Sequence, residues 1–498
     1  MVIAKREKGY IIAKFLVIVV CVAFLIILAC CIQPLIVDAK WFILLIPVIL
    51  IAAVFLWRLI SKAKNSVCIA LFFVLLTVFG ILIYILGLHL EQLPAWDFGR
   101  VQRGAWELTL NGQFQLESTI EYFQEYPNNF FPALYLFRWL VMFTDAGVKP
   151  GDTVLILNTL SLSLAILFIF LTFLRLKQPQ QGLFTAIWCF LFAPFVLYAS
   201  IYYTDTLSMP YVSAIIYVAS ILLTGEFKVK KQVIFAAVLA AVTGVGYLLK
   251  GTPVIAAIAA ILTLFILRGR KTILFLVTFT VIFSITIFWW QSYTKDNPYL
   301  PSGESPYPSQ LTAYHFIMMG LNKNGGYSEA DHVFSTSIAT IEEREAENKR
   351  IIMERIYEYG FIGMLGHLLE KIAFTWADGG YYAPYKISIE PISDSPLLEI
   401  VAYGGSHFKT FSSILSASQL MLLLLLALGF LRDSIKNSVK LDIRYMAKLA
   451  IFGLAFFLLI WETRSRYLVN FAPFLALLGA YEIVYLSDFL KKSASNVG

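Results

Sequence analysis

The stretch IIAKFLVIVVCVAFLIILACCIQ, residues 11–33, decides the class of fold. A run of about 20 apolar residues forms a helix long enough to cross the ~30 Å hydrocarbon core of a bilayer. The stretch is longer than the hydrophobic core of a secretory signal, and no Ala-x-Ala cleavage site follows it. Residues 11–33 are therefore expected to remain in the mature chain as a first transmembrane helix.

Comparable apolar runs recur along the whole chain. They lie near residues 11–33, 41–57, 67–89, 153–174, 183–202, 206–224, 233–249, 252–267, 272–290, 410–431, 447–461 and 467–486. A further run, residues 130–143, is shorter and carries Arg138, so we expect it to lie in the membrane plane or to re-enter rather than to span. The pattern predicts an all-α polytopic membrane protein with about 12–13 transmembrane helices.

The composition excludes a water-soluble globule. Of the 498 residues, 59% are apolar and only 14% are charged, whereas soluble proteins carry roughly 25% charged residues. The net charge of +7 is too small for a nucleic-acid-binding protein, so no nucleic-acid partner is expected. The five cysteines lie in or beside apolar runs, and their spacing supports neither a disulfide framework nor a zinc site.

The positions of the basic residues predict the orientation. With Lys5, Arg6 and Lys8 in the cytoplasm, twelve spans place the other basic clusters on the same side, as the positive-inside rule requires. These clusters are residues 58–64, 175–177, 228–231, 268–271, 432–444 and 491–492. We therefore expect a multi-pass plasma-membrane protein with cytoplasmic N- and C-termini. Two long segments, residues 90–129 and 291–409, then lie outside the cytoplasm.

This plan divides the chain into three regions. They are an N-terminal transmembrane module with the first outer loop (residues 1–290, loop 90–129), a large extracytoplasmic region with amphipathic helices (291–409), and the C-terminal transmembrane helices (410–498).

The large extracytoplasmic region contains local signals for two helices and a loop. Thr340 and Glu343 form a capping box that opens a helix running toward Gly360. Residues 361–376 are apolar but interrupted by charges, so they are expected to lie along the membrane interface. Residues 297–309, rich in Pro, Gly and Ser, are a candidate lid.

Several polar residues stand where predicted spans reach the outer surface. Asp97, in PAWDFGR after the third span, could accept a proton from a hydroxyl group at the membrane surface. The alternative is that Asp97 caps the helix that follows it. The motif EYPNN contains Tyr126, Asn128 and Asn129, and a simple turn is its alternative interpretation.

Three later motifs add charged groups at the same face. They are YYTDT with Tyr203 and Asp205, LLKGT with Lys250, and WETRSRY with Glu462, Arg464, Arg466 and Tyr467. Ionisable groups at membrane depth face a cavity or a partner, and two neighbouring guanidinium groups suit bidentate binding of a phosphate. The alternatives are helix capping by Asp205, snorkelling of Lys250 to the interface, and pairing of the arginines with Glu462.

Together, the motifs resemble those of the GT-C superfamily of polytopic glycosyltransferases, which use polyprenyl-phosphate-linked sugars. Protein O-mannosyltransferases and aminoarabinose transferases belong to this superfamily. The sequences MGLN, which ends at Asn322, and GGY at residues 325–327 are part of the same resemblance. The chain lacks a Lys-Pro-Pro element and a Trp-Trp-Asp element, so N-glycosylation of proteins is not expected.

The resemblance implies roles for individual residues. Asp97 and Asp205 would be the catalytic acids, and Arg464, Arg466 and Lys250 would bind the donor phosphate. The further site candidates are Tyr126, Asn128, Asn129, Tyr203, Asn322, Glu462 and Tyr467. A divalent metal is an open question, because Asp97, Asp205, His315, Asp331 and His332 could converge.

The expected function is extracytoplasmic transfer of a sugar with inversion at its anomeric carbon. The donor, a polyprenyl-phosphate-linked sugar, would enter from the membrane lipid. The acceptor would be a cell-envelope glycan, a teichoic acid, a lipid or a protein. The alternatives are a lipid-linked glycan polymerase or ligase, and a polytopic transporter or flippase.

Overall fold

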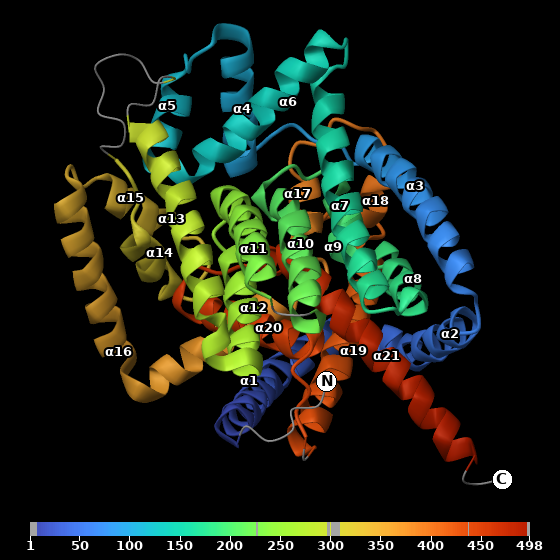
Figure 1. The fold of residues 1–498 in the computed structure, drawn as a ribbon. Helices are drawn as coiled ribbons and strands as arrows, with labels where there is room; N and C mark the ends of the chain where they lie inside the picture. Colours follow the sequence, from blue (N-terminus) through green and yellow to red (C-terminus); the bar gives the residue numbers. More distant parts are fainter. Residues whose placement is uncertain (1–6, 226–227, 296–298, 300–308, 437, 496–498) are drawn as a thin grey trace.

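The computed structural model describes residues 7–225, 228–295, 299, 309–436 and 438–495, and these residues form helices without strands (Figure 1). The long helices are α1 (Glu7–Ala39), α2 (Leu45–Ile60), α3 (Asn65–His89), α7 (Pro150–Arg175), α8 (Pro179–Phe190), α10 (Thr204–Thr224), α11 (Val229–Leu249), α12 (Pro253–Arg268), α13 (Ile273–Lys295), α16 (Ile341–Trp376), α19 (Phe408–Ile435), α20 (Ile443–Ile460) and α21 (Ala472–Ser495). The predicted all-α class is confirmed. Lys5, Arg6 and most of the predicted lid at 297–309 lie outside the described residues.

The number of candidate spans is lower than the predicted 12–13. Among the described residues, nine helices are long and apolar enough to cross a membrane, or ten if the bent pair formed by α8 and residues 193–199 counts as one span. The count is lower because the bent pair replaces the predicted span 183–202, and because two pairs of predicted spans are each counted as one continuous helical run. Gly9–Ile60 unites α1 and α2 through the 3₁₀ turn η1 (Lys40–Leu44), and Pro253–Lys295 unites α12 and α13 through η4 (Gly269–Thr272). Helix α6 (Phe130–Asp145) is not among the candidates.

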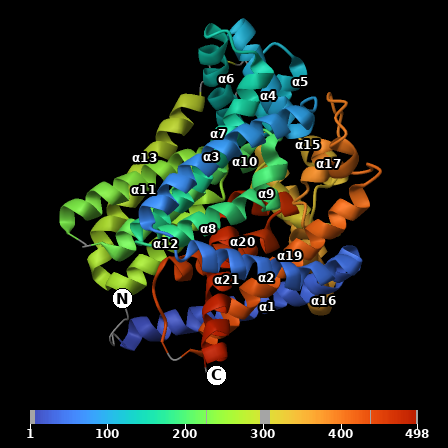
Figure 2. The ribbon, with the colours of Figure 1, turned by 90° about the vertical axis from the view of Figure 1, so that its right-hand side faces the viewer.

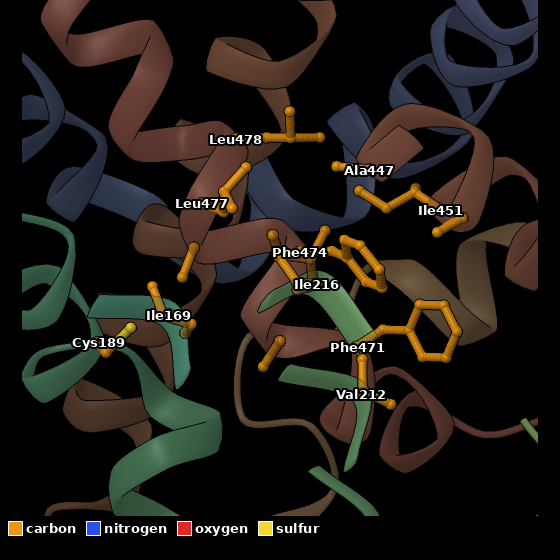
Figure 3. Packing of buried hydrophobic residues seen from close by; sticks show 14 of the residues in the cluster. Ile169, Cys189, Val212, Ile216, Ala447, Ile451, Phe471, Phe474, Leu477 and Leu478 are labelled. Atoms are coloured by element: carbon orange, nitrogen blue, oxygen red, sulfur yellow. The ribbon is translucent and has the colours of Figure 1, made fainter. Parts of the chain in front are cut away.

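The centre of the bundle is closed by apolar side chains from helices far apart in the sequence. Helix α10 packs along α7 and against η5 (Ser465–Phe471), while α1 packs along α19. Figure 3 shows Val212 and Ile216 of α10 beside Phe471, the last residue of η5, and Phe474 in the first turn of α21. These rings exclude water from the bundle centre, so polar side chains there need partners within the protein.

A smaller assembly of helices lies at one end of the bundle, opposite the start of α1 and the end of α21 (Figures 1 and 2). It contains α4 (Trp96–Asn111), α5 (Glu117–Glu125), η2 (Pro127–Asn129) and α6. Glu107 fixes the loop between α4 and α5, because its carboxylate accepts hydrogen bonds from the Gln115 amide at 2.8 Å and from the Thr119 hydroxyl at 2.7 Å. This assembly holds the segment that begins at Trp96 against the end of the bundle.

The region after α13 adds further short helices to the same end of the bundle. They are α14 (Ala313–Gly320), α15 (Glu329–Thr336), α17 (Ala383–Ile387) and α18 (Leu398–Val401). The predicted capping box is confirmed at the start of α16, where Thr340 Oγ1 accepts from the Glu343 amide at 3.2 Å and donates to its carboxylate at 2.9 Å. Contact of residues 361–376 with the membrane interface stays a prediction.

Gly360 divides α16 into two halves that meet at a bend (Figure 1). Its φ of 56° and ψ of −169° lie in a region that is essentially restricted to glycine. We expect Gly360→Ala to lower the free energy of unfolding by about 1–3 kcal/mol, measured by thermal unfolding in detergent.

Gly366 of the same helix is the matched control. It is also exposed, its φ is ordinary, and a methyl group added there meets no atom within 4 Å. Gly366→Ala is expected to be neutral or stabilising, because alanine favours a helix over glycine. Equal destabilisation by both substitutions would contradict a conformational role for Gly360.

Candidate active site

Two acidic and two basic residues that were predicted for the site come together at the end of the bundle that carries α4. Asp205 lies in the first turn of α10 and is completely buried, and its Oδ1 accepts from the ammonium group of Lys250 at the end of α11. Arg466 in η5 lies between two carboxylates, with its guanidinium 4.0 Å from Oδ2 of Asp205 and 3.8 Å from Oδ2 of Asp97. Four segments that are distant in sequence therefore form one cluster.

The carboxylates of this cluster differ in their access to solvent. The side chain of Asp97 is 39% exposed, whereas that of Asp205 is 0% exposed. Oδ2 of Asp205 has no hydrogen-bond partner among the described residues. A buried, unpaired carboxylate oxygen is costly unless nearby positive charge compensates it. Asp97 is therefore the acid that an external molecule can reach, and Asp205 is held between Lys250 and Arg466.

The WETRSRY motif folds as a tight turn whose backbone packs closely against the MGLN motif. A Cβ on Gly320 would lie 2.8 Å from the carbonyl oxygen of Ile460, so a larger residue would push the two segments apart. The turn is also fixed by backbone hydrogen bonds, from Glu462 to Phe316 at 3.0 Å and from Thr463 to the carbonyl of residue 325 at 2.7 Å. Through these contacts, two motifs that are far apart in the sequence lie side by side in the structure.

Glu462 and Tyr467 form a hydrogen-bonded pair beside Arg466. The Tyr467 hydroxyl donates to Oε2 of Glu462 at 2.8 Å, and Arg466 donates to the Tyr467 hydroxyl at 3.3 Å. The Lys250 ammonium lies 4.6 Å from the centre of the Tyr467 ring. Burial raises the pKa of Glu462 above its ordinary value, which favours its neutral form. A neutral Glu462 does not repel an anionic ligand bound near Arg466.

The two arginines of the motif point to different surroundings. Arg464 stacks on aromatic rings, 4.0 Å from the centre of Tyr382 and 4.6 Å from that of Phe374. Between the arginines, the Ser465 hydroxyl donates to Asp378 at 2.6 Å and anchors the turn. The expectation of one fork built from both guanidinium groups is therefore revised, because only Arg466 lies against the two carboxylates.

Lys386 belongs to the same cluster and was missed in the sequence. Its side chain in α17 is 2% exposed, and its ammonium lies 4.6 Å from the ring centre of Phe98 and 5.2 Å from that of Tyr203. Burial and the neighbouring Arg466 lower the pKa of Lys386 to about 7. The available signal was a single lysine inside the aromatic segment YYAPYKI.

The EYPNN motif lies behind Asp97 and orients it through Tyr122. The Asn129 amide donates to the Tyr122 hydroxyl at 2.6 Å, and this hydroxyl lies 3.5 Å from Oδ1 of Asp97. Burial raises the pKa of Tyr122 well above its ordinary value, so the phenol stays a neutral donor. Asn128 in turn donates to Asn129 at 3.3 Å. The sequence did not single out Tyr122.

The remainder of the motif faces a histidine. The ring of Tyr126 is parallel to that of His332, with 6.2 Å between centres, and His332 Nε2 lies 3.2 Å from the Glu125 carboxylate. The hydrogen bond to Glu125 raises the pKa of His332. Asn322 is placed elsewhere, since its amide donates to Asp331, which is paired with Arg355 at 2.6 Å. Asn322 thus supports the fold of α14 and α15.

The possibility of a metal site can be tested on the donor residues. In the part of the chain that the structure describes, no group of three or more His, Cys, Asp or Glu residues is arranged to hold a metal ion. His315 instead bonds to the Ser335 hydroxyl at 2.8 Å. Between Asp97 and Asp205 the positive charge is supplied by Arg466. The described acids and histidines of this region are therefore not arranged to hold a metal ion.

Comparison with known proteins supplies a family. A family model described as "Conserved hypothetical integral membrane protein" matches residues 9–485. No curated protein matches the chain. Among solved structures, the chain is similar to "Crystal Structure of ArnT from Cupriavidus metallidurans bound to Undecaprenyl phosphate", with a TM-score of 0.36, 13% identity, and coverage of 82% of this chain and 77% of that chain. The match over residues 9–485 shows that the chain belongs to this family of integral membrane proteins.

Proposed function

We propose that the protein is an integral-membrane glycosyltransferase that moves a sugar from a polyprenyl-phosphate donor to an extracytoplasmic acceptor. The observation that carries the proposal is the position of the reachable carboxylate of Asp97, 3.8 Å from the buried guanidinium of Arg466. A base for an acceptor hydroxyl and a binding group for a leaving phosphate are thereby placed side by side.

The charges around Arg466 suit a phosphodiester. Arg466, Lys250 and Lys386 supply positive charge, and Asp205 is engaged by Lys250. A guanidinium group can bind phosphate oxygens with two parallel hydrogen bonds. When the bond from the sugar C1 to the phosphate oxygen breaks, the leaving polyprenyl phosphate gains negative charge. Arg466 and Lys386 would stabilise this charge in a site with little water.

Asp97 would act as the general base. The acceptor hydroxyl oxygen attacks C1 from the face opposite the phosphate, and its proton passes to Asp97 as the new glycosidic bond forms. Tyr122 keeps the carboxylate oriented from behind. Direct displacement of this kind inverts the anomeric carbon, and one positioned base contributes about 10²–10⁴ in rate.

An apolar hollow in the bundle offers a path for the prenyl chain. It lies between α1, α16 and α20 and is lined mainly by apolar side chains, among them Ile26, Ile372 and Phe452. Thr375 also lines it, and the Thr375 hydroxyl lies 2.8 Å from that of Thr463, which precedes the two arginines. A lipid tail in this hollow would bring its phosphate toward the turn that carries Arg466.

The direct test uses purified protein in nanodiscs with a panel of polyprenyl-phosphate monosaccharides. We expect one donor to release free polyprenyl phosphate with formation of a new glycoside, detected by mass spectrometry. Movement of an intact lipid-linked sugar across vesicles, without release of the phosphate, would support a transporter and contradict the proposal.

Lys386 predicts a pH dependence. Its pKa of about 7 means that the charged form is lost as the pH rises through 7, so the donor KM is expected to increase above that pH. In Lys386→Arg the group stays charged, and the KM should vary less between pH 6 and about 8.

Lys409→Arg, an exposed lysine of the same region, is the matched control and should keep the wild-type profile. An unchanged profile in Lys386→Arg would show that Lys386 does not bind the donor phosphate.

A further inference from the structure

A column of flat side chains leads from the protein surface to the arginine turn. Trp96 stacks on Tyr385 with 5.7 Å between ring centres and an angle of 23°, and Tyr385 stacks on Tyr382 at 5.0 Å and 21°. Tyr382 lies 4.0 Å from the guanidinium of Arg464, which is 4.6 Å from the Phe374 ring. We call Trp96, Tyr385 and Tyr382 the aromatic column.

The surface end of the column is open. Trp96 is 49% exposed and Tyr385 is 38% exposed. Trp96 immediately precedes Asp97, so the open end of the column and the reachable carboxylate belong to the same turn of chain. A molecule resting on Trp96 would therefore present its groups to Asp97.

The backbone holds the column in place at an energetic cost. Trp96 has a φ of 50° and Tyr382 a φ of 64°, positive values that residues with a side chain rarely adopt. Asp378 fixes the second position by accepting from the Tyr382 amide at 2.8 Å. Strain of this kind persists where the surrounding structure enforces it, and it clusters at binding sites.

Contacts between two distant segments keep the column together. Trp96 comes from the first loop, whereas Tyr382 and Tyr385 come from the region after α16. The Leu93 amide donates to the carbonyl of Glu390 at 2.9 Å, and the Ile392 amide donates to that of Glu91 at 3.0 Å. These two hydrogen bonds join the segment that precedes Trp96 to the segment that follows Tyr385, and so they hold the two rings together.

Saccharides are the class of molecule that this surface fits. A pyranose ring has one face made of C–H groups, which packs on an aromatic ring, while its hydroxyl groups need polar partners at the rim. Trp and Tyr combine a flat apolar ring with an N–H or O–H donor, and Asp97 adds an acceptor. A belt of aromatic residues at a membrane interface requires neither parallel stacking nor strained backbone.

We propose that Trp96 and Tyr385 form the acceptor subsite, and that the acceptor is a saccharide whose ring stacks on Trp96 with a hydroxyl at Asp97. This inference rests on the proposed function, because it assigns the acceptor of the same reaction. It selects a glycan, or the sugar portion of a glycolipid, over a peptide acceptor.

The test measures binding of sugars without catalysis. Saturation-transfer NMR is recorded on the full-length protein in nanodiscs, with tetrasaccharides of glucose, N-acetylglucosamine or mannose as probes. We expect at least one probe to bind the wild-type protein. In Trp96→Ala the signal should fall at least fivefold, and Trp96→Tyr should restore most of it.

Trp289→Ala is the matched control, because Trp289 is an exposed tryptophan of α13 outside the column. It should bind the probe like wild type. Absence of binding for every probe, or equal binding by Trp96→Ala, would overturn the inference. So would quenching of Trp96 fluorescence by brominated lipid chains to the extent seen for Trp289, since Trp96 would then face lipid.

The two proposals fail separately. If donor release occurs but no probe binds, the acceptor subsite is wrong and the transferase activity stands. If probes bind through Trp96 but no donor releases polyprenyl phosphate, the subsite stands as a sugar-binding surface and the proposed function is wrong.

Discussion

Asp97→Asn is expected to lower the rate of sugar transfer by about 10²–10⁴-fold, the contribution of a single general base. The amide has the size of the carboxylate but cannot take the acceptor proton. Asp97 is partly exposed, and Arg466 keeps a second carboxylate, that of Asp205 at 4.0 Å, so neutralising Asp97 leaves no buried charge without a partner. The measurement is release of polyprenyl phosphate by purified protein, with thermal unfolding in detergent to show that the variant is folded.

Asp394→Asn serves as the matched control. Asp394 is an exposed acid in the segment between α17 and α18, outside the cluster around Arg466. It should retain wild-type transfer and stability. Full activity in Asp97→Asn would remove Asp97 from the mechanism, whereas loss of folding in that variant alone would show that the acid is structural.

Arg466→Lys is expected to reduce transfer by about 10²–10³-fold, comparable to the loss of one donor that stabilises developing charge. The guanidinium group reaches toward Asp97 and Asp205 at once, 3.8 and 4.0 Å away, and a single ammonium group cannot reproduce this fork. Arg464→Lys should also lose activity, because an ammonium group cannot stack flat on Tyr382.

The control for these variants is Arg350→Lys, an exposed arginine on α16 paired with neighbouring glutamates. It should leave transfer and unfolding unchanged. Arg466→Lys with normal turnover and normal donor KM would contradict the assignment of Arg466 to the donor phosphate.

Much of the fold could be predicted from the sequence, because a helix in lipid must be apolar over its whole length. The start of α16 followed from the capping box of Thr340 and Glu343. Twelve spans were predicted, whereas the candidate count is nine or ten, because apolarity does not show that two pairs of adjacent runs are joined through a 3₁₀ turn. Residues 40–44 and 269–272 form such turns.

Part of the candidate site could also be predicted. Asp97, Asp205, Lys250 and Arg466 each stand at the end of an apolar run, where a charge is conspicuous, and the structure brings them together. Lys386 lies in the short helix α17, and its place in the cluster depends on contacts with Phe98 and Tyr203 from distant segments.

Other site features depend on side-chain direction. Tyr122 points to Asp97 from α5, whereas Asn322 points away toward Asp331. The column formed by Trp96 and Tyr385 joins two loops separated by most of the chain. Sequence periodicity carries no information about such contacts, because they arise only when the loops fold against one another.

An electron cryo-microscopy structure of Asp97→Asn with a bound polyprenyl-phosphate sugar would locate the donor in the site. We expect the phosphate within about 3 Å of the Arg466 guanidinium, a hydrogen-bond distance, with C1 of the sugar facing residue 97. A phosphate bound instead at the opposite end of α20, beside Arg432 and Arg444, would contradict this expectation.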